Sequence, residues 1–131
     1  MTPLHTLSKR DLAKVTYAYL EAALWSSTDE YDDPFDSNYA VSDFTQDAKT
    51  SAMRDCLVFM FLCDLGGFDL SPLSDDAVGH DLWLTRAGHG AGFWDRDELE
   101  EGEVGRRVSD IVNAGFPALD LYSTDDGTVH F

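Results

Sequence analysis

The sequence predicts an α+β fold in which three helices pack on a small antiparallel sheet of two hairpins. Three features indicate it: two long segments with apolar side chains at helical spacing, a change to a spacing of two after residue 79, and a turn sequence near the carboxyl end. The 131 residues show no repeat and no linker, so we expect residues 1–131 to form one domain that buries a core.

The first helix is expected over residues 8–27. Ser8 and Asp11 have the spacing of a capping box, and apolar residues recur at helical spacing from Leu12 onward. An acidic stretch without lysine or arginine follows as far as residue 43, and its proline and Asp-Ser-Asn sequence are typical of a loop.

The second helix is expected over residues 45–65, because Gly66 and Gly67 form a strong carboxyl-terminal stop signal. Residues 57–62 are apolar on every side, which is typical of a central core helix. The third helix is expected over residues 98–114, although two glycines weaken its beginning by about 1 kcal/mol each relative to alanine.

The two hairpins are expected over residues 80–96 and 119–131. Leu82 and Leu84 alternate with polar or aromatic neighbours, and a glycine-rich turn follows them. In the second hairpin, the Asp-Asp-Gly sequence at residues 125–127 predicts the turn between two short strands.

The two cysteines are expected to be free, buried thiols in a reducing cytoplasm. On one helix Cys56 and Cys63 would lie about 10 Å apart, too far for a disulfide. Residues 1–10 lack the apolar segment of a signal peptide, and the longest apolar run, residues 57–63, is too short to cross a bilayer.

Charge is the strongest functional indication in the sequence. The chain has 25 acidic residues and 9 lysines and arginines, which gives a net charge of −16. Such an excess raises self-repulsion in the compact state, and it argues against binding to DNA, RNA or an anionic membrane. The sequence therefore predicts either a very soluble protein or one whose partner is basic.

Two clusters contain many of the acids. The first is Asp29, Glu30, Asp32, Asp33 and Asp36, and the second is Asp95, Asp97, Glu98, Glu100, Glu101 and Glu103. The first lacks the glycine and terminal glutamate of an EF-hand calcium loop. The second places more acids at a helix start than the helix dipole can use, so we expect it to contact a partner, although a solvated face is the simpler alternative.

The block GHDLWLTRAGHGAGFWDR at residues 79–96 is the most distinctive motif. With LEAALWSSTDE at residues 20–30, DSNY at 36–39 and the DLY–DDG closing segment at 120–127, it resembles a family of small acidic proteins encoded by tailed bacteriophages. The resemblance implies a phage or prophage origin and the cytoplasm of a bacterial host. It supplies no catalytic residue and no reaction.

Several residues of this block have side chains that bind metals or transfer protons. His80, Asp81, His89 and Asp95 match no closed metal motif, and on a hairpin the first two point to opposite faces. A base built from His89 and either carboxylate would lack a neighbouring nucleophile. We therefore expect neither a metal nor an enzyme.

The glycines Gly88, Gly90 and Gly92 resemble part of a phosphate-binding loop. No helix is expected to start there and no lysine follows, so the physical basis for phosphate binding is missing. We expect no cofactor.

The tryptophans offer a second type of contact. Trp83 and Trp94 cannot both point inward if the leucines of the expected hairpin and Phe93 do. At least one exposed tryptophan beside acids would suit a protein–protein contact. The alternative is that the aromatic residues belong to the core.

Together these features predict a non-catalytic phage protein that imitates nucleic acid. Its two acidic clusters and an exposed tryptophan would inhibit a host-defence protein with a basic, nucleic-acid-binding groove, as anti-CRISPR and anti-restriction proteins do. The alternative is a phage accessory protein that binds its partner through the tryptophan hairpin, with charge serving only solubility.

Overall fold

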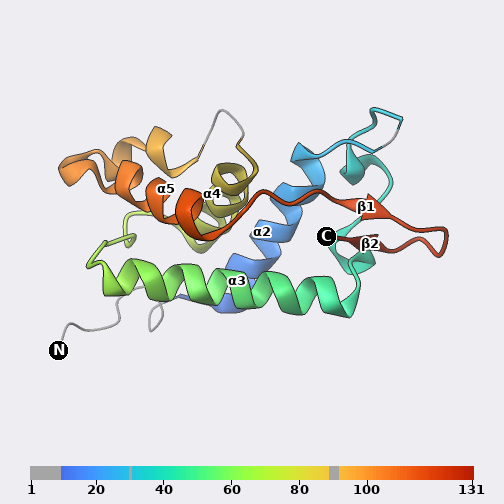
Figure 1. The fold of residues 1–131 in the computed structure, drawn as a ribbon, viewed down its shortest axis with the longest axis horizontal. Helices are drawn as coiled ribbons and strands as arrows, with labels where there is room; N and C mark the ends of the chain where they lie inside the picture. Colours follow the sequence, from blue (N-terminus) through green and yellow to red (C-terminus); the bar gives the residue numbers. More distant parts are fainter. Residues whose placement is uncertain (1–9, 30, 89–91) are drawn as a thin grey trace.

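The computed structural model describes residues 10–29, 31–88 and 92–131. Within them the fold is mostly helical, with four α-helices and one small antiparallel sheet (Figure 1). The elements are α2 (Leu12–Ser26), α3 (Gln46–Leu65), α4 (Asp75–Ala87), α5 (Val104–Gly115), β1 (Tyr122–Ser123) and β2 (Val129–His130). The prediction of helices with a small antiparallel sheet is confirmed, but the described chain has four α-helices and one hairpin.

Helix α2 begins later than predicted, at Leu12, because Asp11 is its N-cap. The Asp11 carboxylate accepts hydrogen bonds from the backbone N–H groups of Ala13 and Lys14. The predicted capping partner, Ser8, lies outside the described residues. The acidic stretch after α2 is irregular, as predicted, and the side chain of Phe35 is buried while that of Tyr31 is exposed.

The predicted hairpin at residues 80–96 is wrong, because α4 occupies residues 75–87. Ser74 caps the helix by accepting from the N–H of Ala77, and two aspartates lie in the first turn. Gly88 ends it in the left-handed conformation, with a φ of 75°. The alternating leucines misled the prediction because almost every side of this helix is buried, so its sequence has no polar stripe.

Helices α2 and α4 pack so closely that their backbones touch. A Cβ atom at Gly79 would lie 2.2 Å from the carbonyl oxygen of Val15. Since only glycine fits there, the approach fixes the position of α4 on α2. The Trp83 indole N–H then reaches Ser26 and donates to its hydroxyl at 2.8 Å.

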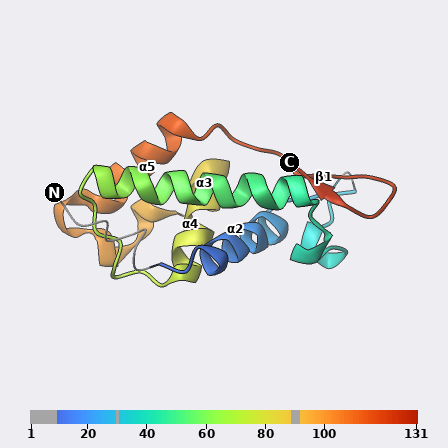
Figure 2. The ribbon, with the colours of Figure 1, turned by 90° about the horizontal axis from the view of Figure 1, so that it is seen from below.

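Helix α3 confirms the second predicted helix almost residue for residue, with Thr45 as its N-cap. It does not lie at the centre of the core. It runs along one side of the molecule, and one of its faces is not covered by another described element (Figure 2). None of the helices in the described part of the chain combines the length and apolar character needed to span a membrane.

The third predicted helix begins six residues later than expected, at Val104. Three short 3-10 turns precede it: η3 (Phe93–Asp95), η4 (Asp97–Leu99) and η5 (Glu101–Glu103). Gly102 and Glu103 both have positive φ angles, 70° and 55°, and this left-handed pair breaks the helix.

The predicted carboxyl-terminal hairpin is confirmed, though its strands are short. Tyr122 pairs with His130 and Ser123 with Val129. The hairpin is held to the core because Phe131 stacks on Phe44 at a centroid distance of 5.3 Å. At its tip, hydrogen bonds from Thr124 and Thr128 lower the pKa of Asp126 to about 2, so this carboxylate stays charged and stabilises the turn.

Candidate functional site

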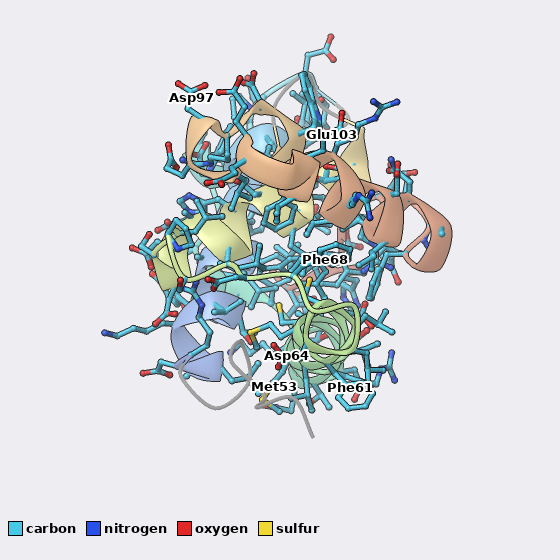
Figure 3. The ribbon with its side chains drawn as sticks, turned by 90° about the vertical axis from the view of Figure 1, so that its left-hand side faces the viewer. Met53, Phe61, Asp64, Phe68, Asp97 and Glu103 are labelled. Carbon is cyan, nitrogen blue, oxygen red and sulfur yellow. The ribbon has the colours of Figure 1, made fainter. Side chains whose placement is uncertain are left out.

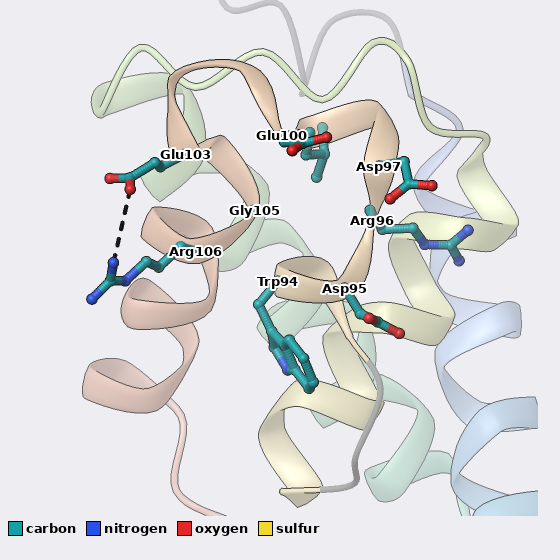
Figure 4. A pocket seen from close by; sticks show the side chains of 9 residues that line it. Trp94, Asp95, Arg96, Asp97, Glu100, Glu103, Gly105 and Arg106 are labelled. Atoms are coloured by element: carbon teal, nitrogen blue, oxygen red, sulfur yellow. Dashed lines mark ion pairs between the residues drawn. The ribbon is translucent and has the colours of Figure 1, made fainter.

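The strongest candidate site is a pocket on the segment that precedes α5. It encloses about 310 Å³ and opens to solvent between the 3-10 turns and the first turn of α5 (Figure 4). Its lining residues are Trp94, Asp95, Arg96, Asp97, Leu99, Glu100, Glu103, Gly105 and Arg106. Four of them belong to the second predicted acidic cluster, so the fold brings an acidic cluster and a pocket together.

Two apolar anchors hold this segment against the core. Phe93 is fully buried and stacks on Phe59 of α3 at a centroid distance of 5.2 Å, and Leu99 is also buried. Gly105 lets the start of α5 approach the segment, because a Cβ there would lie 2.2 Å from the carbonyl oxygen of Phe93. The acidic turns are therefore tied to the core by contacts before and after them.

An ion pair fixes the middle of the segment. Arg96 donates two hydrogen bonds to Asp81 of α4, from Nε at 2.6 Å and from Nη2 at 3.0 Å. The Asp81 side chain is almost fully buried, and its hydrogen bonds raise the pKa of Arg96. Arg96 also lies 3.9 Å from Glu98, so its single charge is shared between the buried Asp81 and one acid of the cluster.

The six carboxylates of this cluster all lie on exposed residues. Two of them form weak ion pairs, Glu98 with Arg96 at 3.9 Å and Glu103 with Arg106 at 3.8 Å; because these carboxylates are well exposed, the pairs contribute little stability. Glu103 also holds a left-handed φ of 55°, a conformation that costs a non-glycine residue about 1 kcal/mol. The segment thus keeps an acid where glycine would be less strained.

The structure separates the two predicted tryptophans. Trp94 is 52% exposed at the edge of the pocket, whereas Trp83 is 1% exposed and packs edge-on against Tyr19. Trp83 is therefore a core residue and not a partner-binding one, and the prediction for it is wrong. The reason is that α4, unlike a hairpin, turns this side chain toward α2.

The first acidic cluster lies at the other end of the molecule, in the loop after α2 (Figures 1 and 2). Asp29 serves the loop itself, since its carboxylate accepts from the N–H groups of Tyr31 and Asp33. Asp32, Asp33 and Asp36 are exposed, and Glu30 lies outside the described residues. A pocket of about 350 Å³ borders the start of this loop at Thr28 and is also lined by Trp83, but none of its lining residues is an acid of this cluster.

The residues considered for metal binding or proton transfer point in different directions. His80 pairs with Glu21 at 3.3 Å and packs against Trp25, whereas Asp81 pairs with Arg96. His89 lies outside the described residues. In the ranges 10–29, 31–88 and 92–131, no group of three or more His, Cys, Asp or Glu side chains is placed to hold a metal ion.

The remaining candidates have structural roles. Gly88 ends α4, and Gly90 lies outside the described residues. The structure therefore describes no phosphate-binding loop formed by these glycines. Cys56 and Cys63 are buried and free, as predicted, and burial raises the pKa of each thiol to about 12. Thiols with such a pKa are poor nucleophiles.

Sequence reasoning missed the partner of Arg96. Arg96 binds Asp81, and the other arginine of the block, Arg86, binds Asp55 at 2.7 Å. One feature of the sequence indicates this pair: Arg96 is the only arginine within the second acidic cluster, and Asp81 precedes it, next to an apolar run. It could be interpreted only once residues 75–87 were recognised as helical.

No protein-family model, curated protein or solved structure matches this chain. The resemblance to small acidic phage proteins therefore stays a prediction.

Proposed function

We propose that this chain is a non-catalytic protein that binds a basic, nucleic-acid-binding groove of a host protein, and that residues 93–106 form its binding surface. One observation supports this most directly: Trp94 is half exposed at the edge of a pocket whose other walls carry Asp95, Asp97, Glu100 and Glu103. Tryptophan is among the residue types most enriched in protein–protein hot spots, and the rim around such an anchor is polar.

The spacing of the acids supports imitation of nucleic acid. Six carboxylates fall within nine residues that form tight turns, and a 3-10 turn rises about 2.0 Å per residue. At that rise the acids follow one another at about one per 3 Å, which is close to the roughly 3.4 Å between charges along one DNA strand and about half the charge density of the duplex. A groove with lysines and arginines would bind such a segment with a strong dependence on salt.

Anchoring by Phe93, Leu99 and Arg96 adds to the proposal. A charged loop that is disordered before binding loses conformational entropy when it binds. A segment already fixed by buried contacts avoids most of that cost. The two acidic clusters lie at opposite ends of the molecule, so we assign the function to one of them and not to a continuous stripe.

The test uses two variants that remove equal charge at different places. One is Asp97→Asn/Glu100→Gln/Glu101→Gln in the pocket segment, and its matched control is Asp32→Asn/Asp33→Asn/Asp36→Asn in the loop. Each variant is immobilised and used to capture proteins from bacterial lysate at about 50 and 200 mM salt, and bound proteins are eluted with duplex DNA.

We expect the unaltered chain and the loop variant to capture a protein that duplex DNA elutes. The binding of this protein should be weaker by at least about tenfold at 200 mM salt. The pocket variant should lose it. The proposal fails if no captured protein responds to DNA or salt, or if the two variants behave alike.

The exposure of Trp94 also fits the second candidate, an accessory protein whose partner is recognised through an aromatic residue. The hairpin on which that alternative was based does not exist, but the exposed tryptophan does. Under imitation of nucleic acid, Trp94→Ala should weaken capture less than the triple charge variant. The reverse order would favour the accessory role.

A further inference from the structure

The outer face of α3 is apolar and open to solvent. Its exposed large side chains are Met53, Leu57, Val58, Phe61 and Leu65, which are between 41% and 65% exposed. Tyr17 of α2 borders the same surface across a shallow groove of about 270 Å³. An apolar surface of this kind, continuous along one helix, is a feature of protein contacts in soluble proteins.

The charges on this face differ from those on the rest of the molecule. Between Ala48 and Leu65 the two acids are not freely exposed, since Asp64 is buried and Asp55 is bound to Arg86 at 2.7 Å. The charges left on the outside of this stretch are positive, on Lys49 and on Arg54, which also lies 3.7 Å from Asp55. Asp47 in the first turn of α3 is exposed, but it precedes the apolar side chains of the face. Two chains with a net charge of −16 would therefore repel each other least if they met at this face.

We propose that the outer face of α3 binds a second copy of this chain, with the two α3 helices antiparallel. In that arrangement the twofold axis meets the outer face of α3 midway between Leu57 and Phe61, so that Leu57 of one copy lies against Phe61 of the other. A twofold interface pairs one surface with the same surface of the other copy, and an apolar stripe along a helix can pair with itself in this way.

The antiparallel direction follows from charge complementarity. The last turn of α3 contains no basic residue to compensate the partial negative charge of its carbonyl groups. Antiparallel packing brings Arg54 of each copy to the last turn of the other copy's helix, near Leu65. Parallel packing would instead bring Arg54 against Arg54.

The expected dimer is weak. The two helices overlap over residues 53–65, so the shared face is about 20 Å long and 10 Å wide and covers about 200 Å² per copy, well below the roughly 800 Å² of a standard interface. We therefore expect a dimer that forms only at high protein concentration. Because added salt screens the repulsion between two acidic chains, the dimer should become tighter with salt.

Sedimentation velocity of the full chain from about 1 µM to 1 mM tests the proposal, at low and high salt. Phe61→Ser should weaken dimerisation at least about tenfold, whereas Tyr31→Ser, which removes an exposed ring from the acidic loop, should leave it unchanged. Arg54→Glu should also weaken dimerisation, and by more than Arg107→Glu, which makes the same charge reversal on α5.

Crosslinking tests the antiparallel geometry. Leu57→Cys and Phe61→Cys proteins are oxidised alone and mixed, with the unaltered chain as the control because its own cysteines are buried. We expect the mixed 57–61 disulfide to predominate.

A chain that stays monomeric at 1 mM, or a dimer insensitive to both Phe61→Ser and Arg54→Glu, would overturn the proposal. Predominant 57–57 crosslinks would overturn the antiparallel arrangement. Neither result bears on the acidic pocket.

Discussion

The acidic segment 93–106 and the outer face of α3 lie on opposite sides of the molecule and have opposite chemistry. Asp97 and Glu103 project from one side, and Met53 and Phe61 from the other (Figure 3). The segment has irregular backbone and exposed carboxylates, yet it is fixed by buried contacts. The α3 face belongs to a regular helix and exposes apolar side chains.

This difference shows that a segment of this protein can be highly charged and still be held firmly by buried contacts. The most charged segment is well anchored, because each of its attachments uses a specific residue: Phe93, Arg96, Leu99 or Gly105. The least charged surface has no cover among the described elements. The two surfaces should therefore respond to salt in opposite directions, with binding through the segment weakened and pairing through α3 strengthened.

The largest effect is expected from Arg96→Ala, which leaves the buried Asp81 carboxylate without its ionic partner. Loss of one member of a buried pair costs several kcal/mol, and since the Arg96 side chain is 35% exposed we expect about 3 kcal/mol. Urea unfolding measures it. Arg107→Ala is the control and should change stability by less than about 0.5 kcal/mol. Equal losses in both variants would show that the segment is not held by this pair.

A smaller effect is expected from Gly105→Ala, because the new methyl group would overlap the carbonyl oxygen of Phe93. Overpacking of this kind costs about 2 kcal/mol. The matched control is Gly115→Ala at the other end of α5, where nothing lies within 4 Å of an added Cβ. Thermal unfolding should distinguish them, and a Gly105→Ala protein as stable as the control would refute the close approach.

The smallest effect is expected from Glu103→Gly, which should stabilise the fold by about 1 kcal/mol by relieving a left-handed φ of 55°. Glu101→Gly removes the same charge from a position without positive φ, so it should destabilise by about 0.5 kcal/mol. If Glu103→Gly gains stability but loses capture of the basic partner, the strained acid is kept for binding. A loss of stability would contradict the strain.

The sequence was most informative where one local signal decided the structure. The Gly66–Gly67 pair marked the end of α3, and the Asp-Asp-Gly turn marked the carboxyl-terminal hairpin. It misled where burial removed the polar stripe, as in α4, and where left-handed residues delayed a helix, as at Gly102. For the candidate site, the sequence indicated the acidic cluster and an exposed tryptophan, either Trp83 or Trp94, but it indicated neither the pocket nor the role of Arg96.

The sequence by itself determined the charge, the helical segments on either side of the acidic loop, and the clustering of acids at two places, because composition and helix signals are local. Only the tertiary structure decided that the clusters lie at opposite ends, that one of them surrounds a pocket, and that α3 is uncovered on one side. These depend on contacts between residues far apart in the chain, such as Asp81 with Arg96 and Gly79 with Val15. No local pattern encodes such pairings.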